Sequence, residues 1–382
     1  MLLTLGVVRE SAPGERRVAL VPGATTVFQK TGAEIVIEAG AGEAAGFPDS
    51  EYREKGVRVA SRAEVFQAAQ VLLQVRTPGA NVEAGAGDMA QLRRGQTVIG
   101  FAEPLTALDR AQSLARRGVN LLAMELMPRI TRAQSMDALS SMATIAGYKA
   151  VLLAADSLPR MFPMLMTAAG TVAPARVLVI GAGVAGLQAI ATARRLGAVV
   201  TATDVRPAAK EQVESLGAKF VAVEDEEFKA AETAAGYAKE MSPEYQAKQA
   251  ALVAEHIKKQ DIVVTTALIP GRPAPRLVSA EHVASMKPGS VLVDLAVEAG
   301  GNVAGAKADE IVETGGVKIV GIANLPGRIA ADSSALYARN LTAFAGLLIK
   351  DGALAPDLED EILKAALVAT GGAVTHPALK TA

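Results

Sequence analysis

The sequence contains no cysteine, which excludes a disulfide, a thiolate nucleophile and a cysteine-ligated metal site. Its three histidines, His256, His282 and His376, are scattered and form no zinc-binding pattern, so we expect no metal site. Aromatic residues make up only 3% of the chain although 50% of its residues are hydrophobic. Val, Leu, Ile and Ala must therefore fill the cores, as is typical of parallel α/β sheets.

An excess of charge of one sign is also missing. The chain has 39 basic and 40 acidic residues, a formal charge of -1 and no long block of either sign, so we expect no binding to nucleic acid. The start, MLLTLGVVRE, lacks the features of a signal peptide, which favours a cytoplasmic location. Glycines interrupt the apolar run from Val177 to Ala193, so we expect no membrane span there.

The length and the hydrophobic pattern predict two domains. A chain of 382 residues exceeds the usual size of one domain. From Leu2 to Leu126 short apolar strands alternate with helical patterns, and from Arg176 to about Ala323 a second such series contains six candidate strands. Alternating strands and helices indicate doubly wound parallel sheets, so the expected fold class is α/β.

Two long helical patterns connect these series. One runs from Ser135 to Ala155, long enough at 1.5 Å per residue to bridge two domains. The other runs from Asp332 to Lys350, and we expect a helical tail from there to about Val368. The predicted organisation is two Rossmann-like domains joined by long helices, with boundaries at 1–137 plus 327–382 and at 138–326.

One stretch breaks the rhythm. Residues from Glu224 to Gln249 are polar and rich in alanine, and they separate a strand from its helix. Loops much longer than about 12 residues are usually functional or disordered. A mobile lid over a cofactor and a solvated helical excursion explain the stretch equally well.

The sharpest motif is VLVIGAGVAGLQAIATARRLGAVVTATD, residues 177–204. A strand leads directly into G-x-G-x-x-G and then a helix, the context that distinguishes a dinucleotide fingerprint from a chance match. Gly181 permits the tight turn, Gly183 lets the backbone approach a pyrophosphate, and Gly186 allows close packing of helix on strand. The helix N-terminus then stabilises the phosphate charge.

Asp204 follows the next strand, at the distance where a carboxylate accepts hydrogen bonds from ribose hydroxyls and repels a 2′-phosphate. NAD(H) is therefore the expected cofactor, although Arg206 lies two residues further on. A dehydrogenase also needs a general acid or base, most often His or Lys. The first domain offers Arg16, Arg17 and Glu103 but no histidine, whereas transfer between two nicotinamides needs only two rings in contact.

At this point the chain resembles, along nearly its whole length, the alpha-subunit family of proton-translocating transhydrogenase, which is akin to alanine dehydrogenase. The segments that carry the resemblance, besides the fingerprint, are PRITRAQSMDALSS (128–141), GYAKEMSPEYQAKQ (236–249), TTALIPGRPAP (265–275) and DLAVEAGGN (294–302). The resemblance implies that Gln134 hydrogen-bonds the nicotinamide and that Arg129, Asp137 and Ser140 shape and polarise the pocket. Asp137 and Ser140 also suit the first turn of the long helix, with Ser135 as its cap.

The resemblance further implies that Tyr237 closes over the bound nucleotide, although it also suits an exposed loop aromatic. The candidate cofactor-binding residues are Gly181, Ala182, Gly183, Val184, Ala185, Gly186, Asp204, Val205, Arg206, Tyr237, Thr266, Ala267 and Leu268.

Alanine dehydrogenase is the main rival interpretation. In that family a catalytic histidine occupies the strand that corresponds to TVIGFAEPL, where this chain places Glu103. A substrate-binding lysine is replaced by Gln74 or Arg76, and a late aspartate corresponds to Glu298. The amino-acid site therefore looks dismantled.

The family implies direct hydride transfer from NADH on this chain to NADP+ on a partner, driven by a proton gradient. The partners are an NADP(H)-binding subunit and a membrane-embedded proton-channel subunit, through which this chain, expected as a homodimer, would attach peripherally to the membrane. A non-catalytic NAD sensor that regulates a partner is a third interpretation, in which the 224–249 stretch acts as the switch.

Overall fold

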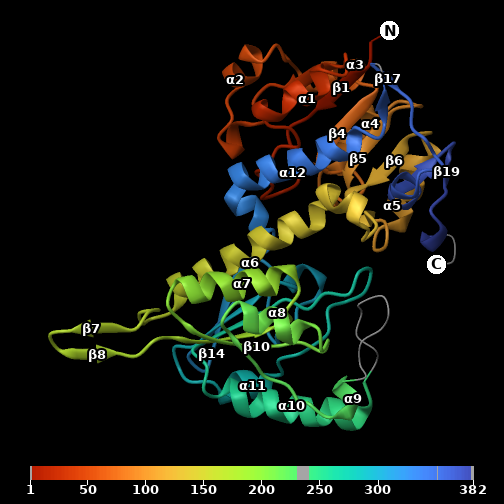
Figure 1. Ribbon diagram of the computed structural model, residues 1–382. Coiled ribbons are helices and arrows are strands. Elements are labelled where there is room, and N and C mark those ends of the chain that lie inside the picture. The colour runs from red at the N-terminus through yellow and green to blue at the C-terminus, as the bar shows by residue number, and fades with distance from the viewer. Residues whose placement is uncertain (1, 230–240, 351, 380–382) are drawn as a thin grey trace. The chain divides into compact units, whose positions relative to one another are not determined.

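Largely parallel sheets form the centre of both halves of the chain. The computed structural model describes residues 2–229, 241–350 and 352–379. Its contacts divide the chain into Met1–Met142 with Pro326–Ala382, called unit 1 here, and Ala143–Leu325, called unit 2. Helices cover both faces of each sheet (Figure 1). The predicted α/β class with two Rossmann-like domains is confirmed.

Unit 1 is built on one sheet whose strands β1 to β6 are parallel to their neighbours. Apolar side chains of α3 and α5 pack on one face of this sheet, and α12 supplies the buried Tyr337 and Phe344. In spatial order the strands are β19 (Ala373–Val374), β18 (Leu367–Thr370), β6 (Asn120–Ala123), β5 (Thr97–Phe101), β4 (Val71–Arg76), β1 (Thr4–Val7), β2 (Glu34–Glu38) and β3 (Arg58–Ala60). The helices are α1 (Thr25–Gln29), α2 (Asp49–Glu54), α3 (Arg62–Ala68), α4 (Gly85–Gln91), α5 (Leu108–Arg116), α12 (Ala330–Ala345) and α13 (Glu361–Ala366).

The expectation of a helical tail to about Val368 is wrong. Helix α12 ends at Ala345, a small hairpin of β16 (Ile349–Lys350) and β17 (Ala353–Leu354) follows, and α13 is short. Strand β18 then pairs antiparallel with β6, and β19 pairs antiparallel with β18 after a turn at Gly371 and Gly372, both with positive φ. Apolar residues in this tail complete the sheet because the edge of β6 is open to them, a long-range contact that helical periodicity does not reveal.

In unit 2, β9 lies between β10 and β12, so the strand order reverses at β9. The strands of its main sheet are, in spatial order, β11 (Lys219–Phe220), β10 (Val199–Thr203), β9 (Arg176–Ile180), β12 (Ile262–Thr265), β13 (Val291–Asp294), β15 (Val317–Gly321) and β14 (Glu310–Thr314). Strand β14, antiparallel to β15, was not among the six predicted strands. The helices are α6 (Ala138–Ser157), α7 (Val184–Arg195), α8 (Ala209–Ser215), α9 (Glu226–Lys229), α10 (Pro243–Ile257) and α11 (Ala280–Ser285).

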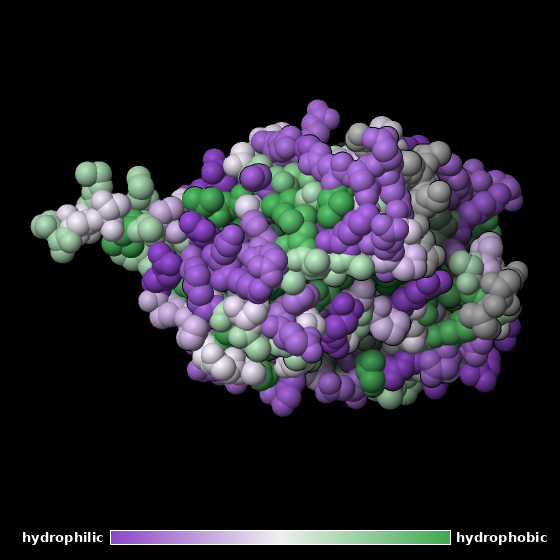
Figure 2. Space-filling model, turned by 90° about the horizontal axis from the view of Figure 1, so that it is seen from below, coloured by the Kyte–Doolittle hydropathy of each residue, from purple (hydrophilic) through white to green (hydrophobic). Residues whose placement is uncertain are grey.

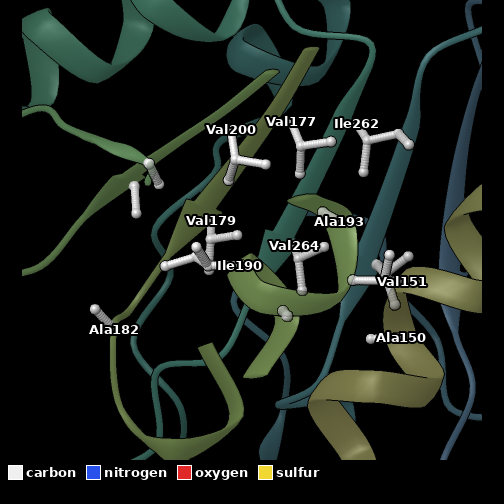
Figure 3. Close-up of a cluster of buried hydrophobic side chains, with 14 of the residues drawn as sticks. Ala150, Val151, Val177, Val179, Ala182, Ile190, Ala193, Val200, Ile262 and Val264 are labelled. Carbon is white, nitrogen blue, oxygen red and sulfur yellow. The ribbon is translucent and has the colours of Figure 1, made fainter. Parts of the chain in front are cut away.

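Alternating side chains of the central strands fill two separate cores, one on each face of this sheet. Val177 and Val179 of β9 pack with Ile190 of α7 and Val151 of α6, as Figure 3 shows. The alternate residues of β9, including Leu178, pack instead with residues of α10 and α11. Burial on both faces explains why the strand sequence is continuously apolar rather than alternating.

The long helix predicted from Ser135 to Ala155 is observed as α6, Ala138–Ser157. Of the described residues, this one helix is long and apolar enough to cross a membrane by length and composition. The core helix of a soluble protein passes the same test, and Ala150, Val151 and Ala154 are indeed buried in unit 2. The sequence pattern had drawn attention to Val177–Ala193, which instead forms β9 and most of α7.

A hairpin of β7 (Leu165–Thr167) and β8 (Gly170–Val172) was not predicted. Its strands pair with each other and form a sheet of their own. In Figure 1 the hairpin extends away from the sheet of unit 2, and in Figure 2 the same arm is at the left, coloured pale to mid green. Its side chains are largely exposed, with Met166 at 85%.

Candidate nucleotide-binding site

The fingerprint forms a strand, a turn and a helix at the carboxyl edge of the unit 2 sheet. Strand β9 ends at Ile180, Gly181 turns the chain with φ of +98°, and Gly183 is the N-cap of α7. The Gly181 N–H donates to the carbonyl of Thr203 on β10, 2.9 Å away, which ties the turn to the neighbouring strand. The turn lies where the strand order reverses, the position at which open α/β sheets bind ligands.

The three glycines have different local surroundings. A Cβ on Gly186 would lie 1.8 Å from the Gly181 carbonyl oxygen, and one on Gly181 would lie 2.5 Å from Thr266 Oγ1. A Cβ on Gly183 would meet no heavy atom of the described residues within 4 Å. Gly181 and Gly186 are therefore required by packing, whereas the space beside Gly183 is open to an incoming group.

Helix α7 presents its N-terminus to this open space. Its N-cap, Gly183, provides no side-chain hydrogen bond, and the first bond inside the helix runs from Leu187 N to Gly183 O. The N–H groups of the first turn thus have no partner within the helix, and the positive end of the helix dipole adds to their pull on an anion. This arrangement suits a phosphate group.

Asp204 follows β10 and its carboxylate contacts both the glycine turn and its own loop. Its Oδ2 accepts a hydrogen bond from Ala182 N at 2.7 Å, and its Oδ1 accepts one from Arg206 N at 2.9 Å. The Arg206 guanidinium adds two more, at 2.9 Å to Oδ1 and 3.0 Å to Oδ2. The adjacent Val205 is 49% exposed.

The loop after β12 forms a further wall. The Thr266 hydroxyl donates to Gly181 O at 3.0 Å, which joins this loop to the glycine turn. The fully buried Asn302 accepts from Ala267 N and donates to the carbonyls of Ala267 and Pro275, so both ends of the intervening loop are held by one side chain. Leu268 projects from this loop and is 55% exposed. Asn302 was missed in the sequence as a positioning residue, although DLAVEAGGN was noted.

The predicted excursion is partly described, but Tyr237 lies outside the described residues. On either side of it, Phe228 of α9 and Tyr245 of α10 are buried in the core of unit 2 and their rings stack. Gln249 of α10 donates to Thr203 Oγ1 at 2.9 Å and accepts from Val223 N at 2.9 Å. The flanks of the excursion are thus held close to the end of β10.

The segment from Arg129 to Ser140 belongs to unit 1. A 3-10 helix spans Thr131–Met136, and the side chains of Arg129 and Gln134 are exposed. Asp137 accepts hydrogen bonds from the Ser140 N–H at 2.9 Å and the Ser140 hydroxyl at 2.5 Å. The cap of α6 is therefore Asp137, and the expectation that Ser135 caps this helix is wrong.

A cluster of charged groups lies at the carboxyl edge of the unit 1 sheet, where sequence reasoning had singled out Arg17, Arg76 and Glu103. Arg17 forms a buried ion pair with Glu15 at 2.6 Å, and Arg76 approaches both Glu15 at 3.4 Å and Glu103 at 3.8 Å. Burial opposes ionisation of Glu15, but the hydrogen bonds and charge of Arg17 outweigh it and lower the pKa of Glu15.

Two further carboxyls in this cluster were missed. Glu10 accepts hydrogen bonds from Val75 N and Arg76 N, yet burial, with the nearby charge of Glu15, raises its pKa to about 8. Glu125 accepts from Ala102 N and Glu103 N through Oε1, while its buried Oε2 has no partner among the described residues, and burial raises its pKa to about 7. Both follow apolar strands, a position that could have drawn attention to them.

The expectation that the first domain has no histidine needs correction, because the C-terminal segment brings His376 into unit 1. His376 follows β19 at the end of the sheet, and β18 and β6 separate β19 from β5 and Glu103. Its pKa is lowered by burial. Within the described residues no group of three or more His, Asp or Glu side chains is placed to hold a metal ion.

Two protein-family models match the chain. The one described as the alanine dehydrogenase/PNT N-terminal domain matches residues 6–146, and the one described as the alanine dehydrogenase/PNT C-terminal domain matches residues 150–377. Together they span both units.

Individual proteins are similar over the whole chain. An NAD(P) transhydrogenase subunit alpha of Rhodospirillum rubrum is 50% identical over 380 residues, which cover 99% of each chain. The crystal structure of transhydrogenase from Sinorhizobium meliloti has a TM-score of 0.88 and 54% identity, with 97% of this chain and 100% of that one covered. A solved L-alanine dehydrogenase has a TM-score of 0.80 and 25% identity, with 99% and 98% covered.

Proposed function

The chain belongs to the alanine dehydrogenase/PNT family, and on that premise we propose that it is the NAD(H)-binding subunit of a proton-translocating transhydrogenase. The observation that carries the proposal is the glycine turn at Gly181–Gly186, open at Gly183, with Asp204 beside it. These groups match the pyrophosphate and the ribose of a dinucleotide. The cofactor is NAD(H), which lacks the 2′-phosphate that Asp204 would repel.

The reaction is direct hydride transfer between NADH on this chain and NADP+ on a partner subunit. Such a transfer needs two nicotinamide rings held in contact and no general acid or base. The polar edge of unit 1 agrees with this chemistry, because Glu103 stands where the related dehydrogenases carry a catalytic histidine and it approaches Arg76 at 3.8 Å. Glu298 accepts a hydrogen bond from Asn324 N at 3.1 Å, a contact that suits a structural role.

The partners are an NADP(H)-binding subunit and a membrane-embedded proton-channel subunit, and the proton gradient drives the transfer. The name "subunit alpha" of the relatives supports the existence of other subunits. We place this chain in the cytoplasm, attached to the membrane through those partners.

The proposed contacts of the cofactor follow the site. Gln134 hydrogen-bonds the nicotinamide, and Tyr237 closes over the nucleotide. Arg129 shapes the pocket, while Asp137 and Ser140 hold the first turn of α6 and thereby the segment that carries Gln134. The wall around the pyrophosphate and adenosine consists of Gly181, Ala182, Gly183, Val184, Ala185, Gly186, Val205, Arg206, Thr266, Ala267 and Leu268.

Reconstitution tests this function. Mixing the chain with its NADP(H)-binding subunit should give rapid hydride transfer from NADH to an NADP+ analogue, and either protein alone should give none. Gln134→Ala should lower the transfer rate by at least tenfold with a smaller change in NADH affinity, because one hydrogen bond to the reacting ring is lost. No transfer by the mixed parent proteins contradicts the proposal.

Alanine dehydrogenase is the second candidate, favoured by the similarity of fold to the solved L-alanine dehydrogenase. It predicts that this chain alone reduces NAD+ in the presence of L-alanine. We expect no turnover between pH 6 and 10, because the charged groups at the unit 1 edge pair with one another. Measurable NADH formation would make this second candidate the function.

The family also implies a homodimer, and we place the contact with the second copy at the β7–β8 hairpin. Met164 and Met166 are 60% and 85% exposed on an arm that projects from its own unit. Exposed side chains of this size on a projecting arm are costly in water unless a partner covers them.

A double variant, Met164→Glu and Met166→Glu, should weaken the dimer by about a hundredfold or more, because burying two methionines stabilises a contact by about 3 kcal/mol or more. Sedimentation equilibrium of the parent and the variant measures the change. Leu358→Glu, at a 50% exposed position of unit 1, is the control. A double variant that remains as dimeric as the control refutes this assignment.

A further inference from the structure

The carboxylate of Asp204 is saturated by groups of the protein itself. Each of its oxygens accepts two hydrogen bonds: Oδ1 from Arg206 N and Nε, and Oδ2 from Ala182 N and Arg206 Nη2, all between 2.7 and 3.0 Å. A carboxylate offers about four such acceptor positions. Ribose hydroxyls therefore have no free acceptor on Asp204 in this arrangement.

The four donors differ in how readily they can leave. Ala182 N and Arg206 N are backbone groups fixed by the glycine turn and by the loop after β10. The Arg206 guanidinium stands on a flexible side chain that is 31% exposed, whereas the Asp204 side chain is only 7% exposed. A swing of Arg206 toward solvent frees one acceptor position on each oxygen, the number that the 2′- and 3′-hydroxyls of one ribose require.

We propose that Arg206 is a specificity-determining residue that occupies the ribose position of the empty site, is displaced by the hydroxyls of NAD(H), and when displaced lies beside the 2′-position of the ribose. This inference rests on the proposed dinucleotide site and adds to it a competitor built into the chain. The apparent affinity for NADH is then the intrinsic affinity reduced by the fraction of molecules in which Arg206 has left Asp204.

The same displacement determines how strictly a 2′-phosphate is excluded. Asp204 alone repels that phosphate, but a displaced guanidinium is a strong, planar donor to phosphate oxygens. With Arg206 present, discrimination against NADPH is therefore weaker than Asp204 alone would give. Removing Arg206 should change the two affinities in opposite directions, which loss of general stability cannot do.

The experiment compares NADH and NADPH binding to the full chain and to Arg206→Ala by nucleotide fluorescence. We expect NADH to bind about fivefold more tightly to the variant, because an exposed ion pair of ordinary strength no longer competes. NADPH should bind about tenfold more weakly, because the carboxylate is left without its neighbouring cation. Arg195→Ala, an exposed arginine at the far end of α7, controls for the lost charge.

NADH affinity that is unchanged or weaker in Arg206→Ala overturns the inference, as does NADPH affinity that does not fall. Asp204→Asn separates this failure from failure of the site itself. If Asp204→Asn weakens NADH binding while Arg206→Ala does not tighten it, the site stands and Arg206 is not a competitor. If Asp204→Asn leaves NADH binding unchanged, the proposed dinucleotide site is wrong.

Discussion

A Gly183→Val variant should fold as the parent does and bind NADH at least a hundredfold more weakly. Gly183 has φ of -74° and ψ of -169°, an extended conformation that valine adopts without strain. No heavy atom of the described residues lies within 4 Å of the place its Cβ would take. The added side chain therefore has nothing to collide with except a ligand, and it occupies the space that the pyrophosphate needs at the N-terminus of α7.

The control for this prediction is Gly186→Ala. At Gly186 a Cβ would lie 1.8 Å from the Gly181 carbonyl oxygen, so helix and strand must move apart. This variant should melt at a markedly lower temperature, whereas Gly183→Val should melt with the parent. Fluorescence titration with NADH and thermal unfolding of both variants decide the matter. A Gly183→Val protein that keeps its NADH affinity disproves the pyrophosphate position.

A Glu125→Gln variant should become more stable relative to the parent as the pH rises. Burial raises the pKa of Glu125 to about 7 from an ordinary value of 4.5, so the folded state holds a proton that the unfolded state releases. The stabilisation from this proton is complete below about pH 4.5 and is lost as the pH rises through 7. The full loss corresponds to roughly 3 kcal/mol of unfolding free energy.

Glutamine suits this position because the unpartnered Oε2 is the atom that carries the proton, while Oε1 accepts from Ala102 N and Glu103 N. An amide keeps that acceptor and cannot ionise. Urea unfolding of parent and variant at pH 5 and pH 9 measures the difference, with Glu54→Gln at an exposed position as the control. A difference that does not grow between these pH values contradicts a buried, protonated Glu125.

The sequence by itself determined the chemistry of the glycine turn, because all of its parts are contiguous. A strand, three glycines at fixed spacing, a helix and an acidic residue after the next strand lie within residues 177–204. Local backbone geometry then places Gly181 in a positive-φ turn and Gly183 at the start of α7. The α/β class followed in the same way, from the repeated alternation of strand and helix patterns.

The tertiary structure alone decided the features that depend on partners distant in sequence. The residues of β18 were predicted as the end of a helical tail, but they form a strand because the open edge of β6 offers hydrogen bonds. The raised pKa of Glu125 arises from burial among segments that no local pattern joins. The saturation of Asp204 depends on the rotamer of Arg206 and on the Ala182 N–H, 22 residues earlier. Periodicity records which face of an element is buried, whereas only the folded chain determines what lies against that face.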